Sequence, residues 1–168
     1  MNNFIDKTFA VIADILLKLL PASKKEKQAF SYYRAGMSAQ LKGRYSEALD
    51  NYFESLELEE DPYDRSYTMY NIGIIYGNTR CFNESLIFYH EALRLNSNFP
   101  QALYNIGIIY HTQATRAQSL GGDENLILSE EFFDKAANYW CRALKLAPDN
   151  YPGVRNWLEV TERMDNLE

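Results

Sequence analysis

Few side chains in this sequence combine the residue type and the spacing that metal binding or nucleophilic catalysis requires. Cys81 and Cys141 stand far apart and form no CxxC pair, and with His90 and His111, the only histidines, they do not match zinc-ligand spacing. We expect both thiols to be reduced and half-buried, and His90 to be a surface or packing residue. Since His111 has no partner for nucleophilic catalysis, a role in binding is the simpler interpretation. The sequence predicts no metal and no other cofactor.

A run of carboxylates and a pair of glycines are the remaining candidates for chemistry. The carboxylates belong to Glu59, Glu60, Asp61 and Asp64. Paired carboxylates can act as acid and base, but these fall in a predicted turn, where a solvated surface is the simpler interpretation. The pair Gly121-Gly122 lacks the lysine and the preceding strand of a phosphate-binding loop. We therefore expect no enzyme activity and no small-molecule substrate.

The composition indicates a soluble globular protein and argues against a nucleic-acid partner. The chain has 168 residues, which suits one domain, with 46% hydrophobic and 24% charged residues. Its net charge is −6, whereas nucleic-acid binding relies on clustered lysine and arginine. The 13 tyrosines are unusual, and tyrosine is enriched where helices pack and where partners bind.

Residues 1–21 carry apolar side chains at helical spacing, which predicts an amphipathic helix that ends at Pro21. The stripe consists of Phe4, Ile5, Phe9, Ile12, Leu16 and Leu19. Charged residues interrupt it, so no apolar run reaches the roughly 20 residues of a membrane span, and no cationic stretch of a signal peptide precedes it. Two interpretations stay open: the helix packs on the rest of the fold, or it contacts a membrane surface or a partner helix.

An internal repeat determines the expected fold. The heptapeptide Tyr70–Tyr76 recurs without change as Tyr104–Tyr110, at an offset of 34 residues, which is the period of the tetratricopeptide repeat. In that repeat the first helix has a small residue where it meets the second, and the second helix has a small–aromatic–small pattern. The matching residues are Gly36, Gly73 and Gly107 in the first helices, and Ala48-Tyr52-Ser55, Ser85-Tyr89-Ala92 and Ala136-Trp140-Ala143 in the second helices.

The sequence thus predicts an all-α tetratricopeptide-repeat solenoid of three helix hairpins with flanking helices at both ends. The repeats occupy 27–148, as about 29–65, 66–99 and 100–148, with Pro62 and Pro148 closing the first and the third. Residues 149–168 are expected to form a C-terminal capping helix, which starts at Asp149 or Asn150.

The third repeat contains a 17-residue insertion between His111 and Phe133. We expect the first helix to continue to Leu120, the glycine pair to break it, and Ser129 to cap the next helix. The third hairpin would then have longer helices and project beyond its neighbours. A tolerated loop insertion and an added contact surface are both compatible with this pattern.

The first helices of such repeats line a concave groove, and the repeat register assigns residues to it. They are Tyr33, Arg34 and Met37 from the first repeat, Tyr67, Tyr70, Asn71 and Ile74 from the second, and Tyr104, Asn105, Ile108 and His111 from the third. Aromatic rings supply contact area and asparagine can bond a peptide backbone, so an extended polypeptide is the expected ligand. The alternative is that the tyrosines pack between repeats.

One known ligand class is disfavoured. Repeat proteins that hold the acidic tails of heat-shock chaperones use Lys, Asn, Asn, Lys and Arg at five groove positions. The equivalent residues here are Tyr33, Met37, Asn71, Gln101 and Asn105, of which only Asn71 matches. Without the cations, a carboxylate in the groove would lose its hydration without compensation.

Several stretches outside the generic repeat resemble one family. Asn3–Phe9, Tyr32–Gln40, Pro62–Tyr67 and the long third repeat ending at Tyr139-Trp140 resemble the photosystem I assembly proteins of plastids and cyanobacteria. The resemblance implies a peripheral thylakoid protein on the stromal or cytoplasmic side. It would act as a non-catalytic assembly chaperone that binds photosystem I core or stromal subunits and other assembly factors. The alternative is a generic adaptor that ties two soluble partners together.

Overall fold

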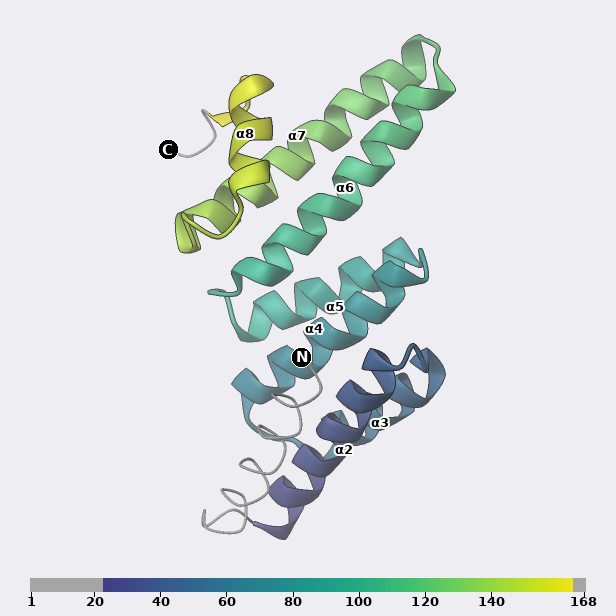
Figure 1. Ribbon diagram of the computed structural model, residues 1–168, viewed down its shortest axis with the longest axis vertical. Helices are drawn as coiled ribbons and strands as arrows, with labels where there is room; N and C mark the ends of the chain where they lie inside the picture. The colour runs from purple at the N-terminus through teal and green to yellow at the C-terminus, as the bar shows by residue number, and fades with distance from the viewer. Residues whose placement is uncertain (1–22, 165–168) are drawn as a thin grey trace. The chain divides into compact units, whose positions relative to one another are not determined.

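The computed structural model describes residues 23–164, and within that range the chain forms seven helices and no strand (Figure 1). The all-α prediction is therefore confirmed. The helix expected over 1–21 lies outside the described residues. The described chain divides into two units, up to Glu60 and from Asp61 onward.

The first unit is a hairpin of α2 (Lys24–Leu41) and α3 (Tyr45–Leu58). A capping box begins α2: the Ser23 hydroxyl accepts from the Glu26 amide at 3.1 Å, and the Ser23 amide donates to the Glu26 carboxylate at 2.6 Å. Gly43, with φ of 70°, turns the chain between the helices. The carboxylate of Glu60 pairs with Lys25 of the same unit.

The second unit contains two further hairpins and a final helix. The hairpins are α4 (Pro62–Asn78) with α5 (Phe82–Leu95), and α6 (Pro100–Leu120) with α7 (Asp123–Leu146). The last helix is α8 (Pro152–Val160). Helix α5 packs on α6, so the two hairpins stack as consecutive repeats do.

Pro148 follows the end of α7, as expected for the close of the third repeat, whereas Pro62 starts a helix instead of closing the first repeat. Pro62 was expected to close the first repeat, but it is the first residue of α4, so the boundary expected near 65 falls inside that helix. The Asp61 carboxylate caps α4 by accepting from the amides of Tyr63 at 2.8 Å and Asp64 at 3.0 Å. Asp61, from the predicted solvated turn, therefore has a structural role.

The helices of the third hairpin are lengthened as expected, but the cap of α7 is not Ser129. Gly121 and Gly122 have φ of 67° and 85° and reverse the chain at once, so α7 begins at Asp123. Ser129 is buried inside α7, and its hydroxyl donates to the Leu126 carbonyl at 2.7 Å. The acidic first turn of α7 suits the positive end of the helix dipole.

A C-terminal helix is present as predicted, but its N-cap residue is not one of the two that the sequence suggested. Tyr151 occupies the N-cap position of α8, without a side-chain hydrogen bond, so neither Asp149 nor Asn150 caps the helix. Val154 and Leu158 of α8 are buried in one cluster with residues of α7 that include Cys141.

The two thiols have different environments. Cys141 is buried beneath α8, whereas Cys81 is exposed in the turn before α5. The expectation that both are half-buried is therefore wrong. Position explains the difference, because Cys141 lies on the packed face of a helix and Cys81 precedes one.

In each hairpin, an aromatic ring of the second helix packs directly on a glycine of the first. The pairs are Gly36 with Tyr52, Gly73 with Tyr89, and Gly107 with Trp140. A Cβ atom built on Gly73 would lie 2.6 Å from ring carbons of Tyr89, and one on Gly36 would lie 2.7 Å from those of Tyr52. The small residues that the repeat pattern places in the first helices are therefore required, because a larger residue would clash with the ring.

Replacing Gly73 by alanine should destabilise the protein. The added methyl group meets the Tyr89 ring, which lies in a closed core, and overpacking of this kind costs about 1–3 kcal/mol. This exceeds the advantage of about 1 kcal/mol that alanine has over glycine inside a helix. Urea unfolding followed by circular dichroism measures the change.

Gly153→Ala is the matched control, because a methyl group added to Gly153 of α8 would meet no atom of another described element within 4 Å. It should be neutral or slightly stabilising. Equal free energies of unfolding for the two variants would contradict the packing argument.

Candidate functional site

In the first unit, the expected binding residues on α2 are only partly accessible. The Tyr33 ring lies 5.9 Å from the ring of Tyr52 and 6.4 Å from that of Phe30, so it takes part in hairpin packing. Tyr33 and Arg34 are half-buried and have further interactions. Met37 is 41% exposed and is the accessible apolar side chain among the three.

In the second unit, the expected binding residues form a tyrosine–asparagine network. The Asn105 amide on α6 donates to the phenol oxygens of Tyr70 on α4, at 3.3 Å, and Tyr89 on α5, at 3.2 Å. The rings of Tyr67 and Tyr70 lie 4.8 Å and 4.7 Å from Phe99. Burial raises the pKa of Tyr70 and Tyr89, so both phenols are neutral at physiological pH. The network joins two consecutive hairpins.

Helix α8 and the segment before it cover part of the expected surface of the third repeat. The ring of Tyr104 on α6 stacks on that of Tyr151, with centroids 4.5 Å apart. The His111 ring lies 5.3 Å from Trp157 of α8 and 5.4 Å from Trp140 of α7. Tyr104 and His111 are therefore partners of the C-terminal segment. The two aromatic residues of that segment were the sequence signal that could have indicated this.

An open hollow remains beside α8. Its volume is about 450 Å³, and its lining includes Tyr104, Ile108, His111, Tyr151 and Trp157. Ile108 is 40% exposed, so it offers an apolar side chain to a ligand at this place.

The remaining expected residues are less accessible. Asn71 is half-buried and has further interactions, and Ile74 packs against the cluster around Tyr89. The structure therefore brings the expected residues of α4 and α6 together and shows that most of them also pack. That a partner contacts them stays a prediction.

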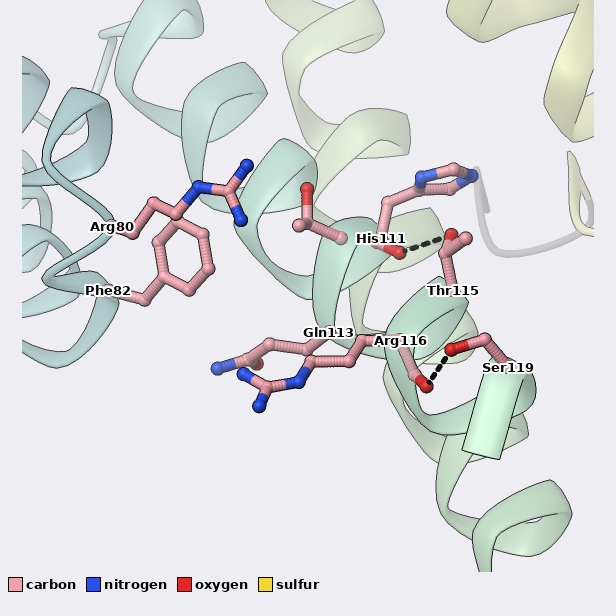
Figure 2. A pocket seen from close by; sticks show the side chains of 8 residues that line it. Arg80, Phe82, His111, Gln113, Thr115, Arg116 and Ser119 are labelled. Carbon is pink, nitrogen blue, oxygen red and sulfur yellow. Dashed lines mark hydrogen bonds between the residues drawn. The ribbon is translucent and has the colours of Figure 1, made fainter. Parts of the chain in front are cut away.

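A second hollow, of about 650 Å³, was not expected from the sequence. It lies between the turn that joins α4 to α5 and the second half of α6 (Figure 2). Arg80 and Phe82 line it from one side, and Gln113 and Arg116 line it from the other. These residues do not belong to a common sequence motif. The only sequence signal is that α6 contains no acidic residue.

Residues 23–164 contain no group of three or more His, Cys, Asp or Glu side chains that could hold a metal ion. None of their helices combines the length and the apolar character needed to cross a bilayer. In the same range, no buried side-chain nitrogen or oxygen is without a hydrogen-bond partner.

The stacked helix hairpins and their glycine–aromatic contacts define a helical-repeat protein. The apolar and amide groups along its first helices suit protein partners. No family model matches the chain. The chain is 72% identical over 166 residues to "Photosystem I assembly protein Ycf3" of Phaeodactylum tricornutum, covering 99% of each. It is 66% identical to the protein of that name from Trieres chinensis, covering 100% of this chain and 99% of the relative.

A more distant relative extends the comparison. The protein with the same name from Rippkaea orientalis is 54% identical over 164 residues, covering 98% of this chain and 93% of the relative. The chain therefore belongs to the photosystem I assembly protein Ycf3 family. The resemblance that the sequence indicated is confirmed.

Acidification should destabilise the protein through His111. Burial lowers the pKa of this imidazole, and burial with the nearby Arg142 lowers that of His90. The unfolded chain takes up protons near the ordinary pKa of about 6.5, so protonation favours unfolding. The free energy of unfolding should fall as the pH is lowered through that value, and the loss is complete below the folded-state pKa.

The His111→Gln variant should show a flatter decline between about pH 7.5 and about pH 5.5, measured by urea unfolding at each pH. His90→Gln provides the comparison, and the double variant removes both histidine contributions. An unchanged slope in the double variant would refute this assignment.

Proposed function

We propose that this protein is an assembly factor for photosystem I, which binds subunits of the complex during assembly and acts without catalysis. The observation that carries the proposal is the 72% identity, over 99% of both chains, to a protein whose name states this role. Identity at this level along the whole length supports the same fold and the same surfaces, and not merely a shared repeat.

The accessible groups suit an extended polypeptide. Ile108 of the second unit offers an apolar contact for such a ligand, and Met37 offers a separate one on the first unit. Tyr70 accepts a hydrogen bond from Asn105, which leaves its own hydroxyl proton for a carbonyl of the ligand. Apolar anchors with backbone hydrogen bonds are the usual means of holding an extended segment, and grooves of this kind bind with micromolar affinity, about −8 kcal/mol. Such an affinity permits release once assembly is complete.

The expected location is the thylakoid membrane, with peripheral attachment on the stromal or cytoplasmic side. The apolar stripe of residues 1–21 supports this, because a stripe broken by charges suits a membrane surface better than a span. The partners would be photosystem I core or stromal subunits and other assembly factors.

Co-purification tests the proposal. The tagged protein is isolated from gently solubilised thylakoid membranes, and its partners are identified by mass spectrometry. Photosystem I core subunits without the full peripheral set are the expected result. Recovery of soluble partners alone would overturn the proposal and favour the generic adaptor. Fractionation separates the same two alternatives, since an assembly factor should pellet with membranes and leave them on washing with salt or alkali.

Replacing Ile108 by serine should weaken client recovery in that experiment. Loss of its apolar contact with a ligand should weaken the binding free energy by about 0.7–1.4 kcal/mol, which corresponds to roughly a three- to tenfold decrease in affinity. Quantitative mass spectrometry of the captured subunits measures the effect.

Ile87→Ser is the matched control, because Ile87 is an exposed isoleucine of α5, at 60%, and lies outside the expected binding positions. Both variants should retain the helical circular dichroism of the parent. Equal client recovery with the two variants would remove Ile108 from the binding surface.

A further inference from the structure

The turn between α4 and α5 contains an arginine where the corresponding turn of the first hairpin contains glycine. Gly43 and Arg80 both have left-handed φ, of 70° and 62°, and both lie two residues before the next helix. The amide of Gly43 donates to the Gln40 carbonyl at 2.9 Å, and that of Arg80 donates to the Gly77 carbonyl at 3.1 Å. Glycine adopts this conformation without steric cost, whereas a residue with a Cβ atom is strained there. Arg80 thus has a strained backbone at a turn for which the chain elsewhere uses glycine.

The side chain of Arg80 contributes to a cationic hollow. Figure 2 shows Arg80 and Phe82 extending from the turn, and Gln113 and Arg116 extending from α6 toward them. Within the described part of the chain, neither guanidinium forms an ion pair or a side-chain hydrogen bond with another residue. The lining includes no carboxylate from residues 23–164, although the whole chain has a net charge of −6. Such a hollow attracts anionic groups, and arginine binds carboxylates in bidentate fashion.

The other polar groups of the lining indicate that the ligand also carries hydrogen-bond donors. The hydroxyls of Thr112, Thr115 and Ser119 donate to carbonyls of their own helix, at 2.8, 2.9 and 2.7 Å. Their protons are therefore engaged, and toward a ligand they can only accept. The amide of Gln113 can both donate and accept. A phosphate ester offers almost no donors at neutral pH, whereas a polypeptide backbone offers N–H groups beside the carboxylates of its side chains.

We propose that this hollow binds an acidic polypeptide segment of a partner protein, with carboxylates on Arg80 and Arg116 and an apolar side chain against Phe82. The site is separate from the groove positions of the heat-shock-tail clamp, which this chain lacks. The second half of α6 belongs to the insertion of the third repeat, so the insertion forms a binding surface. The proposal concerns the chemistry of the ligand and does not depend on photosystem I being the client.

Fluorescence anisotropy of the full chain with short labelled peptides tests the proposal. One peptide alternates aspartate with leucine, and its neutral twin has asparagine in place of aspartate. The acidic peptide should bind more tightly, and added salt should weaken its binding. Arg80→Gly and Arg116→Gln should each lower its affinity about tenfold, as expected for loss of one charge-assisted hydrogen-bonding group.

Control variants separate the ligand contact from folding. Arg80→Gly should unfold at an equal or higher temperature than the parent, because it relieves the strained turn, so its loss of binding would not reflect unfolding. Arg80→Lys keeps the charge but loses the bidentate fork, so its affinity should fall between those of the parent and of Arg80→Gly. Lys145→Gln removes a positive charge from an exposed position of α7 outside the hollow and should bind as the parent does.

Three results would overturn the proposal. The neutral peptide could bind as tightly as the acidic one, or the two arginine variants could bind as Lys145→Gln does. Alternatively, inorganic phosphate or phosphatidylglycerol vesicles could bind in a manner that depends on Arg80 and Arg116 while the acidic peptide does not, which would assign the hollow to phosphate groups.

Discussion

The aromatic ring that each second helix places on a glycine of the first helix fixes how closely the two helices approach. Since no Cβ atom fits between Gly107 and Trp140, the indole lies against the α6 backbone, where its N–H donates to the Tyr104 carbonyl at 3.0 Å. In the second hairpin, the Tyr89 ring lies on Gly73, and its hydroxyl accepts from Asn105 of the next hairpin. The same contact therefore sets the distance within one hairpin and links it to the following one.

This arrangement limits which surfaces are free for a partner. Within each unit, neighbouring rings pack against tyrosines of the first helices, and the more accessible apolar side chains are Met37 in the first unit and Ile108 in the second. The C-terminal segment covers Tyr104, which shortens the surface in the third repeat. This architecture suits binding through several modest contacts, because the two hollows of the second unit are both open to solvent.

The sequence predicted the pairing of helices well because the repeat offset and the small–aromatic pattern report contacts inside a hairpin. It predicted helix ends less well. Ser129 is a good N-cap residue, but Gly121 and Gly122 reverse the chain before it, so the helix has already begun. Pro62 begins a helix because the first residue of a helix does not need its N–H group for an intrahelical hydrogen bond. The hollow of Arg80 and Arg116 could not be predicted, since the two residues line the same hollow only because α6 lies beside the α4–α5 turn.

Most contacts between helices of the second unit lie within a hairpin, and consecutive hairpins add fewer. Chains dominated by such near-neighbour contacts have low contact order and fold quickly, because little chain entropy is lost before the contacts form. Each hairpin contains its own ring and glycine, so it can begin to form as soon as its second helix has left the ribosome. A protein that acts in the assembly of a large complex would then be folded soon after its own synthesis.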